Sequence, residues 1–247
     1  MVRRRLATPQ GNRTIIASPA SSLRYLNPFA VIRDKPLFDF CARFVKPGNR
    51  VWDLGANVGV FTFSAAAAAG PGGSVIAVEA DSFSAWLLTR SCLLVPDSDA
   101  RPVVLTVAIS DRNRIDRFSV PERSRASGHL LQSAGSTQAG GTRQVNHVVT
   151  TDLNWLRRET GDPDVVKIDI EGMELVALSA APQLLTEARP VLHLEVWEEI
   201  ADELSRLLIS HDYLLFDGDS DESLRNPLPR TAWATTAVPR EKLGAYL

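Results

Sequence analysis

The sequence is poor in cysteine and in net charge, and it has no long apolar run. Among its 247 residues, Cys41 and Cys92 lie in apolar segments, which favours inert buried thiols over a disulfide framework or a metal cluster. The formal net charge of -2 gives no reason to expect nucleic acid or an anionic membrane as a partner. A membrane span needs about 18 consecutive apolar residues, and no apolar run in this sequence approaches that length. The basic residues near the start are not followed by the apolar region of a signal peptide. We therefore expect a cytoplasmic protein without a membrane span.

The most informative segment is the glycine-rich turn in residues 51–61, VWDLGANVGVF. The apolar residues around Asp53 predict the end of a buried strand, and Gly55, Asn57 and Gly59 predict a tight turn into an alanine-rich helix. A strand that turns through glycines into a helix places free backbone N–H groups and the positive helix end around a small ligand. The alternative is an ordinary glycine turn of an α/β protein.

The spacing of this turn indicates which ligand it would take. A dinucleotide fingerprint reads G-x-G-x-x-G, whereas Asn57 gives the pattern D-x-G-x-N-x-G, which resembles the first motif of S-adenosylmethionine (SAM)-dependent methyltransferases. The next predicted strand ends in Glu79, whose carboxylate can accept hydrogen bonds from both hydroxyls of a ribose. Enzymes that bind NAD share the acid at this place, so Glu79 alone does not distinguish the two cofactors.

Predicted strands and helices alternate along most of the chain, and two strands without a helix between them close it. This order predicts one α/β domain over residues 31–247, with a mostly parallel sheet and one antiparallel edge strand. Residues 1–30 are polar and contain turn residues, so we expect a loose or docking N-terminal arm. Residues 121–141 lie between two alternating strands, at 115–120 and 144–150, and predict an active-site flap rather than a spacer without function.

A second informative segment is VVKIDIEGMEL, residues 165–175. In an open α/β sheet, ligands bind beside the carboxyl ends of the strands, next to the point where the strand order reverses. Asp169 and Glu171 follow the predicted strand, and their alternation predicts that both side chains lie on one face. Two carboxylates so close repel each other when both are ionised, unless a cation lies between them. Lys167 is a candidate for that cation, or it pairs with a buried acid elsewhere.

Several segments together resemble the FkbM-type methyltransferases, a family of class I SAM-dependent enzymes. They follow in order from about Asp34 to the C-terminus: DLGANVGVFTFSAA, VIAVEAD, VAISD, VTTDL, VVKIDIEGMEL, PVLHLEV and TTAVPRE. The resemblance implies a Rossmann-like fold with a sheet of about seven strands and helices on both faces. It also implies SAM as the cofactor, and methylation of a hydroxyl group on a saccharide, polyketide or other secondary or surface metabolite.

The same resemblance implies roles for particular residues. Those implied for the methionine end of SAM are Asp53, Gly55, Asn57 and Gly59. Glu79 is implied for the ribose, and Ala108 and Asp111 for the surroundings of the adenine. Asp169, Glu171 and Gly172 are implied to line the acceptor site.

The reaction requires that the acceptor oxygen be aligned with the methyl group and relieved of its proton. Alignment can lower the barrier by roughly 7–11 kcal/mol, and a positioned base contributes about 10²–10⁴-fold in rate. Asp169 is our first candidate for the base and Glu171 the second. His147 and His129 are further candidates that could point at the acceptor, whereas His193 lies in an apolar strand and is expected to be a satisfied core residue.

A role for a metal ion and two other functions remain alternative hypotheses at this point. Mg²⁺ could acidify the hydroxyl group, with Asp169, Glu195 and Asp152 as oxygen ligands, although no spacing requires a metal. A nicotinamide-dependent oxidoreductase or epimerase would have the same succession of strand, glycine turn and helix, but Asn57 in place of a glycine argues against this function. A non-catalytic SAM-binding protein would keep the glycine turn and would need neither Asp169 nor Glu171.

Overall fold

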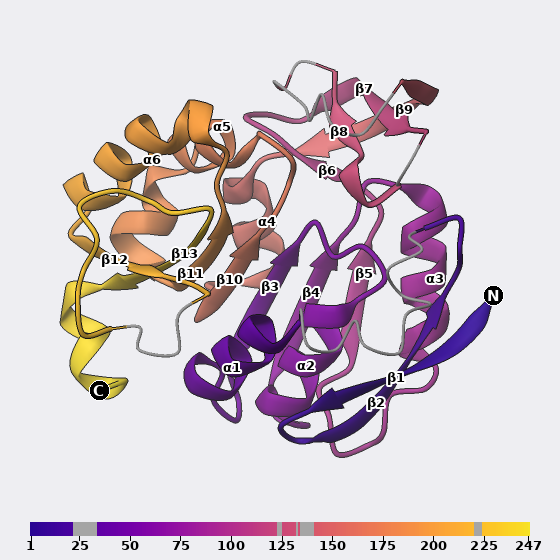
Figure 1. Cartoon of the computed structure of the whole chain (residues 1–247), viewed down its shortest axis with the longest axis horizontal. Helices are drawn as coiled ribbons and strands as arrows, with labels where there is room; N and C mark the ends of the chain where they lie inside the picture. Colours follow the sequence, from indigo (N-terminus) through magenta and orange to yellow (C-terminus); the bar gives the residue numbers. More distant parts are fainter. Residues whose placement is uncertain (22–33, 123–124, 132, 134–140, 220–223) are drawn as a thin grey trace.

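A computed structural model of the chain describes residues 1–21, 34–122, 125–131, 133, 141–219 and 224–247. Its centre is a seven-stranded sheet with the order β12-β13-β11-β10-β3-β4-β5 (Figure 1). The strands are β3 (Arg50–Leu54), β4 (Ser74–Val78), β5 (Pro102–Leu105), β10 (Val165–Ile168), β11 (Val191–Glu195), β12 (Tyr213–Asp217) and β13 (Ala234–Pro239). The pairings from β11 to β5 are parallel, whereas β13 runs antiparallel to both β11 and β12.

The predicted mostly parallel sheet of about seven strands is confirmed, but the antiparallel strand does not lie at the edge. The chain folds back after β12, and β13 inserts between β11 and β12. Both sides of β13 are therefore hydrogen-bonded, and all six of its residues are buried. The sequence pattern predicted two closing strands, but their apolar residues do not reveal which of them has two neighbours.

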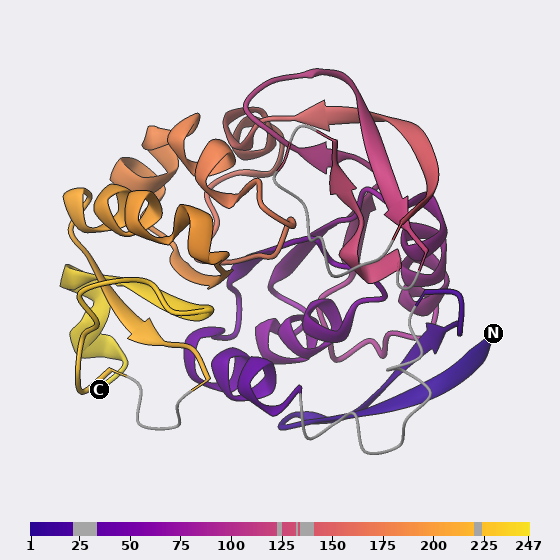
Figure 2. The same cartoon turned by 45° about the horizontal axis from the view of Figure 1, so that its top comes forward.

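Helices cover both faces of the sheet, as predicted (Figures 1 and 2). One face is covered by α1 (Lys35–Phe44), α2 (Val60–Ala69) and α3 (Ser82–Cys92), and the other by α4 (Leu153–Thr160), α5 (Glu174–Ser179) and α6 (Glu198–Ser210). Successive residues of a strand point to opposite faces, so Val51 packs in the core of the first face and Trp52 in that of the second. In the described part of the chain, every helix falls short of the length and apolar character needed to cross a membrane.

The helix that follows β10 is short. It ends as α5 at Ser179, and a π-helical turn (Leu184–Ala188) follows. Pro182 explains the break, because a proline lacks the backbone N–H group and disfavours the helical conformation of the residue before it.

The N-terminal residues form a packed hairpin rather than a loose arm. Strands β1 (Val2–Thr8) and β2 (Gly11–Ala17) pair antiparallel, and their buried Leu6 and Ile15 pack with Leu87 and Leu88 of α3. Of the two expectations for this arm, a loose segment is wrong for these strands, whereas docking onto the domain agrees with their packing against α3. The prediction overlooked that the residues on either side of the turn alternate between buried and exposed positions. The remaining part of the predicted arm, residues 22–30, lies outside the described residues.

A second sheet stands over the carboxyl ends of the central strands (Figure 2). It has the order β6-β9-β7-β8, with β6 (Ala108–Ile109), β7 (Arg114–Pro121), β8 (His129–Leu130) and β9 (Thr142–Thr151). The strands predicted at 115–120 and 144–150 are confirmed as β7 and β9. Residues 102–109 form two strands in different sheets, because the chain leaves the central sheet after β5 and joins the second sheet as β6. The predicted flap 121–141 contains β8 and a short helix (Arg125–Ser127), and its other residues lie partly outside the described ranges.

The strand order of the central sheet reverses between β3 and β10. From β3 the chain proceeds outward through β4 and β5, and it returns to the other side of β3 with β10 and β11. Ligands of open α/β sheets bind at such a reversal, beyond the carboxyl ends of the strands. The glycine turn after β3 and the acidic turn after β10 are therefore neighbours at this edge.

Candidate active site

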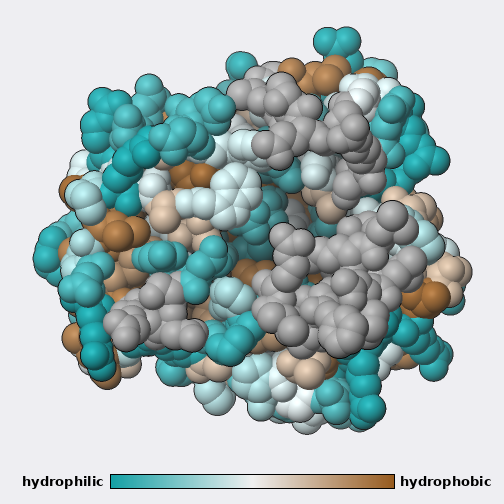
Figure 3. Space-filling model, viewed as in Figure 1, coloured by the Kyte–Doolittle hydropathy of each residue, from teal (hydrophilic) through white to brown (hydrophobic). Residues whose placement is uncertain are grey.

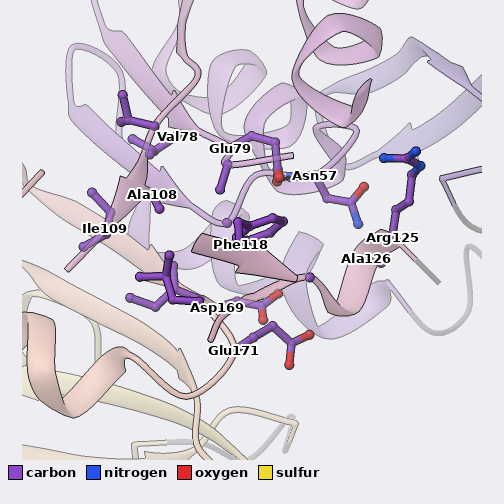
Figure 4. A pocket seen from close by; sticks show the side chains of 16 residues that line it. Asn57, Val78, Glu79, Ala108, Ile109, Phe118, Arg125, Ala126, Asp169 and Glu171 are labelled. Atoms are coloured by element: carbon purple, nitrogen blue, oxygen red, sulfur yellow. Dashed lines mark hydrogen bonds between the residues drawn. The ribbon is translucent and has the colours of Figure 1, made fainter. Parts of the chain in front are cut away.

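A cavity lies at this reversal, between the carboxyl ends of β3, β4 and β10 and the underside of the second sheet (Figure 4). The space between these elements amounts to about 580 Å³, a volume that includes open solvent. Figure 3, which has the viewing direction of Figure 1, shows a hollow with hydrophilic residues near the middle of the molecule. In Figure 4, Glu79 and Asn57 lie on one side of the cavity and Asp169 and Glu171 on the other.

The glycine turn after β3 touches the backbone after β10. Gly55 has a φ of +79°, and a Cβ atom added there would lie 1.8 Å from the carbonyl oxygen of Asp169. Glycine is therefore required at this position both for its φ and for the close approach of two backbones. Asn57 also has a positive φ of 50°, and its Oδ1 atom is buried without a hydrogen-bond partner in the part of the chain that the structure describes.

Glu79 is fixed by backbone donors at the edge of the cavity. Its Oε2 accepts a hydrogen bond from the N–H group of Asn57 at 2.7 Å, and its Oε1 accepts one from that of Asp81 at 2.7 Å. Burial raises the pKa of Glu79 to about 7, against the effect of these two hydrogen bonds. The contacts orient the carboxyl group and leave lone pairs for a ligand in the cavity.

Lys167 connects the two turns from below. Its Nζ lies 3.1 Å from Asp169 Oδ2, 3.2 Å from the carbonyl oxygen of Gly55 and 3.6 Å from Asp53 Oδ1. Burial alone would lower the pKa of Lys167, but the carboxylates of Asp169 and Asp53 hold it above its ordinary value, so the side chain is charged. The predicted cation is thus present, but it lies between Asp169 and Asp53 and not between Asp169 and Glu171.

The turn after β10 is shaped by Glu174, a buried side chain that our sequence analysis overlooked. Its carboxylate accepts hydrogen bonds from the backbone N–H groups of Ile170 at 2.9 Å and Gly172 at 3.1 Å. Between these donors, Glu171 has a positive φ of 53° and lines the cavity. Burial, followed by the charges of Asp169, Glu195 and Glu174, raises the pKa of Glu171 to about 8.

Comparison with known proteins identifies the domain that carries this cavity. A family model described as "Methyltransferase FkbM domain" matches residues 53–215, which include both turns and most of the central sheet. The chain belongs to the FkbM methyltransferase family. It is accordingly a SAM-dependent methyltransferase. No curated protein matches the chain significantly.

Three solved structures to which the chain is similar are distant from it in sequence. Precorrin-6y C5,15-methyltransferase from Geobacter metallireducens GS-15 is 13% identical, with a TM-score of 0.49 over 89% of this chain and 92% of that one. An FkbM methyltransferase from Methylobacillus flagellatus KT is 16% identical, with a TM-score of 0.49 over 85% of this chain and 55% of that one. A SAM-dependent O-methyltransferase from Thermotoga maritima is 14% identical, with a TM-score of 0.44 over 83% of this chain and 64% of that one. This chain thus spans less than two thirds of the latter two proteins.

Several residues predicted for the cofactor site of this FkbM domain line the cavity, and others do not. Gly55, Asn57, Glu79 and Ala108 are among the lining residues. Asp53 is not, because its side chain is fully buried beneath the turn, where it accepts a hydrogen bond from Thr62 at 2.5 Å and faces Lys167. Burial raises the pKa of Asp53, and Lys167 opposes this effect. The predicted direct contact between Asp53 and the ligand is therefore wrong; Asp53 supports the glycine turn from beneath, through Thr62 and Lys167.

Gly59 and Asp111 also lie away from the cavity lining. A Cβ atom at Gly59, the residue before α2, would lie 2.5 Å from Leu88 and from Phe63, so this glycine serves close helix packing. Asp111 forms ion pairs with Arg112 at 3.3 Å and Arg114 at 3.2 Å, at the start of the second sheet. Neither position supports the predicted contact with the cofactor.

The histidine candidates for catalysis are not supported by their positions. His147 pairs with Arg117 on the neighbouring strand β7 and is exposed, whereas the next β7 residue, Phe118, points into the cavity. Because successive strand residues face opposite sides, His147 points away from the cavity, and its predicted catalytic role is wrong. His129 is partly exposed and is not a lining residue, although both its neighbours are. His193 is buried in the core, as expected, and burial followed by the charge of Lys167 lowers its pKa to about 3. Its Nδ1, however, has no partner among the described residues, so the histidine is not fully satisfied.

The possible Mg²⁺ site is not formed either. Among the described residues, no three His, Cys, Asp or Glu side chains are grouped so that they could hold a metal ion. Asp152, one of the three candidate ligands, instead caps α4 by accepting a hydrogen bond from the backbone of Trp155 at 2.7 Å.

The second sheet contributes Phe118, a lining residue that sequence reasoning missed, and the segment predicted as a flap contributes Arg125. Phe118 of β7 lies at the centre of the cavity wall, and a Cβ atom at Gly128 would lie 2.5 Å from its ring. Arg125 also lines the cavity and pairs with Asp81, the residue that caps α3, at 2.7 Å. Its guanidinium group lies 5.2 Å from the ring centre of Phe83. The alternation of residues 115–120 predicted a strand, but no sequence signal showed which of its faces meets the cavity.

Proposed function

We propose that this enzyme transfers a methyl group from SAM to a hydroxyl group of a saccharide, polyketide or other secondary or surface metabolite. The observation that carries the proposal is the direct contact between the two turns at Gly55 and Asp169. Because of this contact, the carboxyl groups of Asp169 and Glu171 face the same cavity as Asn57 and Glu79. An acceptor proton and the cofactor would then be within reach of one another.

The cavity residues fit SAM as the cofactor. We assign the methionine end to the turn of Gly55 and Asn57, the ribose to Glu79, and the adenine to the apolar wall that includes Ala108 and Phe118. The unpartnered Asn57 Oδ1 supports this assignment, because a buried acceptor without a donor costs free energy that a ligand N–H or O–H group would recover. When bound, SAM supplies a methyl group that is already activated on a sulfonium.

The two acids after β10 differ in a way that suggests separate roles. A pKa of about 8 leaves Glu171 mostly protonated at neutral pH, so it can donate a hydrogen bond to the acceptor but is a poor proton acceptor. Asp169 is held by Lys167 through Oδ2, which leaves Oδ1 for a hydroxyl proton. We therefore assign Asp169 as the general base and Glu171 as the residue that orients the acceptor. A helix-capping role for Asp169 has no support, because Met173 precedes α5 without a side-chain cap.

Cofactor choice is tested by thermal unfolding with SAM, S-adenosylhomocysteine and NAD in parallel. A ligand at 100 times its Kd stabilises the folded state by about 2.7 kcal/mol. We expect stabilisation by the first two ligands, lost for Glu79→Gln and retained for Glu199→Gln, an exposed glutamate on α6. Stabilisation by NAD alone would favour an oxidoreductase, and an unchanged response of Glu79→Gln would remove Glu79 from the cofactor site.

The chemistry of transfer is tested with SAM that carries a labelled methyl group, and with pyranosides and hydroxylated macrolactones as acceptors. An O-methyl ether survives mild base, whereas a methyl ester releases methanol under the same conditions. We expect a base-stable label on an oxygen atom. Label found on nitrogen or lost in base would refute hydroxyl methylation, and bound SAM without transfer to any acceptor would favour a non-catalytic SAM-binding protein.

A further inference from the structure

Beyond the cavity, the carboxyl edge of the sheet continues to β11. Ile168 of β10 pairs with Leu194 of β11, so the residues that follow, Asp169 and Glu195, lie side by side at this edge. Neighbouring strands are about 4.8 Å apart. The carboxylate of Glu195 is also among the charges that raise the pKa of Glu171, which indicates that the acidic surface extends from the cavity toward β11.

Two tryptophans stand at the end of this acidic edge. Trp197 follows β11 and precedes α6, and Trp233 precedes β13, where its carbonyl oxygen accepts a hydrogen bond from the N–H group of Val196 at 2.7 Å. The two rings meet edge to face, with their centres 5.2 Å apart and an angle of 78° between them. Trp233 is 53% exposed and Trp197 is partly exposed.

The distance from these rings to the cavity suits a ligand that extends beyond the reacting group. Glu195 pairs with Ala234 on β13, so Trp233 lies about two strand spacings, roughly 10 Å, from the end of β10. An exposed pair of large aromatic rings on a surface typically marks an interaction site. Trp233 contacts Trp197, and more than half of its surface still faces solvent.

The combination of aromatic rings and carboxylates indicates the chemistry of that ligand. The face of a pyranose ring presents C–H groups, which pack against the negative face of an aromatic ring, and its hydroxyl groups donate hydrogen bonds to carboxylates. A phosphate or carboxylate ligand would instead be repelled by the carboxylates of Asp169 and Glu195. A neutral sugar satisfies both parts of the surface.

We propose that Trp197 and Trp233 form a stacking platform for a pyranose ring of the methyl acceptor, with Glu195 accepting hydrogen bonds from its hydroxyl groups. This inference rests on the proposed function and narrows its acceptor class to sugars and sugar-bearing metabolites. Trp233 supplies the exposed ring face, and Trp197 holds that ring through the edge-to-face contact.

The platform is tested by saturation-transfer NMR with the enzyme in the presence of S-adenosylhomocysteine. The probes are methyl α-D-glucopyranoside and methyl α-L-rhamnopyranoside, and sorbitol is the acyclic control. We expect saturation of the ring C–H protons of at least one pyranoside, a loss of at least fivefold in Trp233→Ala, and partial retention in Trp233→Phe. Trp86→Ala is the matched control, because Trp86 is 42% exposed on α3 and packs against Phe83 there.

Several outcomes would overturn the platform. They are the absence of signal from both pyranosides, equal signals in Trp233→Ala and Trp86→Ala, or a full signal in Trp233→Leu, which keeps an apolar side chain without a ring. Calorimetry with S-adenosylhomocysteine separates this failure from that of the proposed function. Binding of the nucleoside without any pyranoside signal refutes the platform alone, whereas absence of nucleoside binding refutes the proposed cofactor site.

Discussion

The contact between the glycine turn and the acidic turn makes a quantitative prediction for Gly55→Ala. The new methyl group would lie 1.8 Å from the carbonyl oxygen of Asp169, although Cβ contacts below 3.0 Å are essentially never seen. The two backbones must therefore separate by more than about 1 Å. This movement would strain the hydrogen bond from Asp169 N–H to Leu54 O at 3.0 Å and the contact of Lys167 with Gly55 O at 3.2 Å.

A matched control separates this steric effect from the effect of backbone conformation. Gly48 has a φ of +86°, like the +79° of Gly55, but a Cβ atom there meets nothing within 4 Å. Alanine at either position costs about 1–2 kcal/mol for the left-handed conformation. At Gly55 we add about 0.5–1.5 kcal/mol for the backbone hydrogen bond and about 1.5–3 kcal/mol for the hydrogen bond from the charged lysine.

We therefore expect Gly55→Ala to destabilise the fold by about 3–6.5 kcal/mol and Gly48→Ala by about 1–2 kcal/mol. For a domain of this size, 1 kcal/mol shifts the Tm by about 2–4 °C, so the two variants should differ clearly in thermal unfolding. Calorimetry with S-adenosylhomocysteine should show more than a tenfold loss of affinity for Gly55→Ala and no loss for Gly48→Ala. Equal Tm values for the two variants, together with unchanged affinity in both, would refute the claim that this contact organises the site.

Three further changes test single side chains of the cavity. Because burial raises the pKa of Glu171, the folded state binds its proton more tightly than the unfolded state; the stability that Glu171 contributes is present below pH 4.5 and is lost as pH rises through about 8. Glu171→Gln should therefore flatten the fall in Tm between about pH 5 and about pH 8.5. An unchanged dependence of Tm on pH would contradict the raised pKa. Arg125→Ala removes the ion pair with Asp81 and part of the cavity wall, and calorimetry should show roughly tenfold weaker binding of S-adenosylhomocysteine; Arg90→Ala, on the neighbouring helix α3, should bind normally, and equal affinities would exclude Arg125 from the site. Asp169→Asn should bind S-adenosylhomocysteine normally but methylate a pyranoside acceptor about 10²–10⁴-fold more slowly. A rate within a few-fold of that of the parent enzyme would exclude Asp169 as the base and favour Glu171.

The parts of the site that could be predicted from the sequence depend on local signals. Gly55 and Asn57 adopt positive φ angles because the turn requires them, and the D-x-G-x-N-x-G pattern carries that requirement directly. The cavity position of Glu79 and Asp169 follows from their place after parallel strands, since parallel strands that are neighbours end at one edge. These inferences also needed the order of the strands in the sheet, which the alternation of strands and helices does not show and which the structure supplies.

The parts that could not be predicted depend on contacts between distant segments. A one-residue difference in register moves a strand residue to the opposite face, so the sequence could not decide between Phe118 and Arg117 as the lining residue of β7, or place His147. Asp53 looked like a ligand contact because it ends a strand in a binding motif, but α2 and Lys167 cover it. Glu174 was overlooked because its role is to accept hydrogen bonds from the backbone N–H groups of Ile170 and Gly172, and these contacts form only once the turn has folded.

The buried charges beneath the cavity show why the two motifs of this domain act together. Lys167 pairs in register with Asp53 on β3 and with His193 on β11, so these three side chains form a row across one face of the sheet. His193 is neutral at physiological pH, which leaves the single charge of Lys167 to compensate Asp53 below the glycine turn and Asp169 beside it. A buried carboxylate without such a partner would be strongly destabilising. Asp53 of the glycine turn therefore holds Lys167, and Lys167 in turn contacts both Gly55 and Asp169, so that one buried charge fixes the two turns that line the cavity.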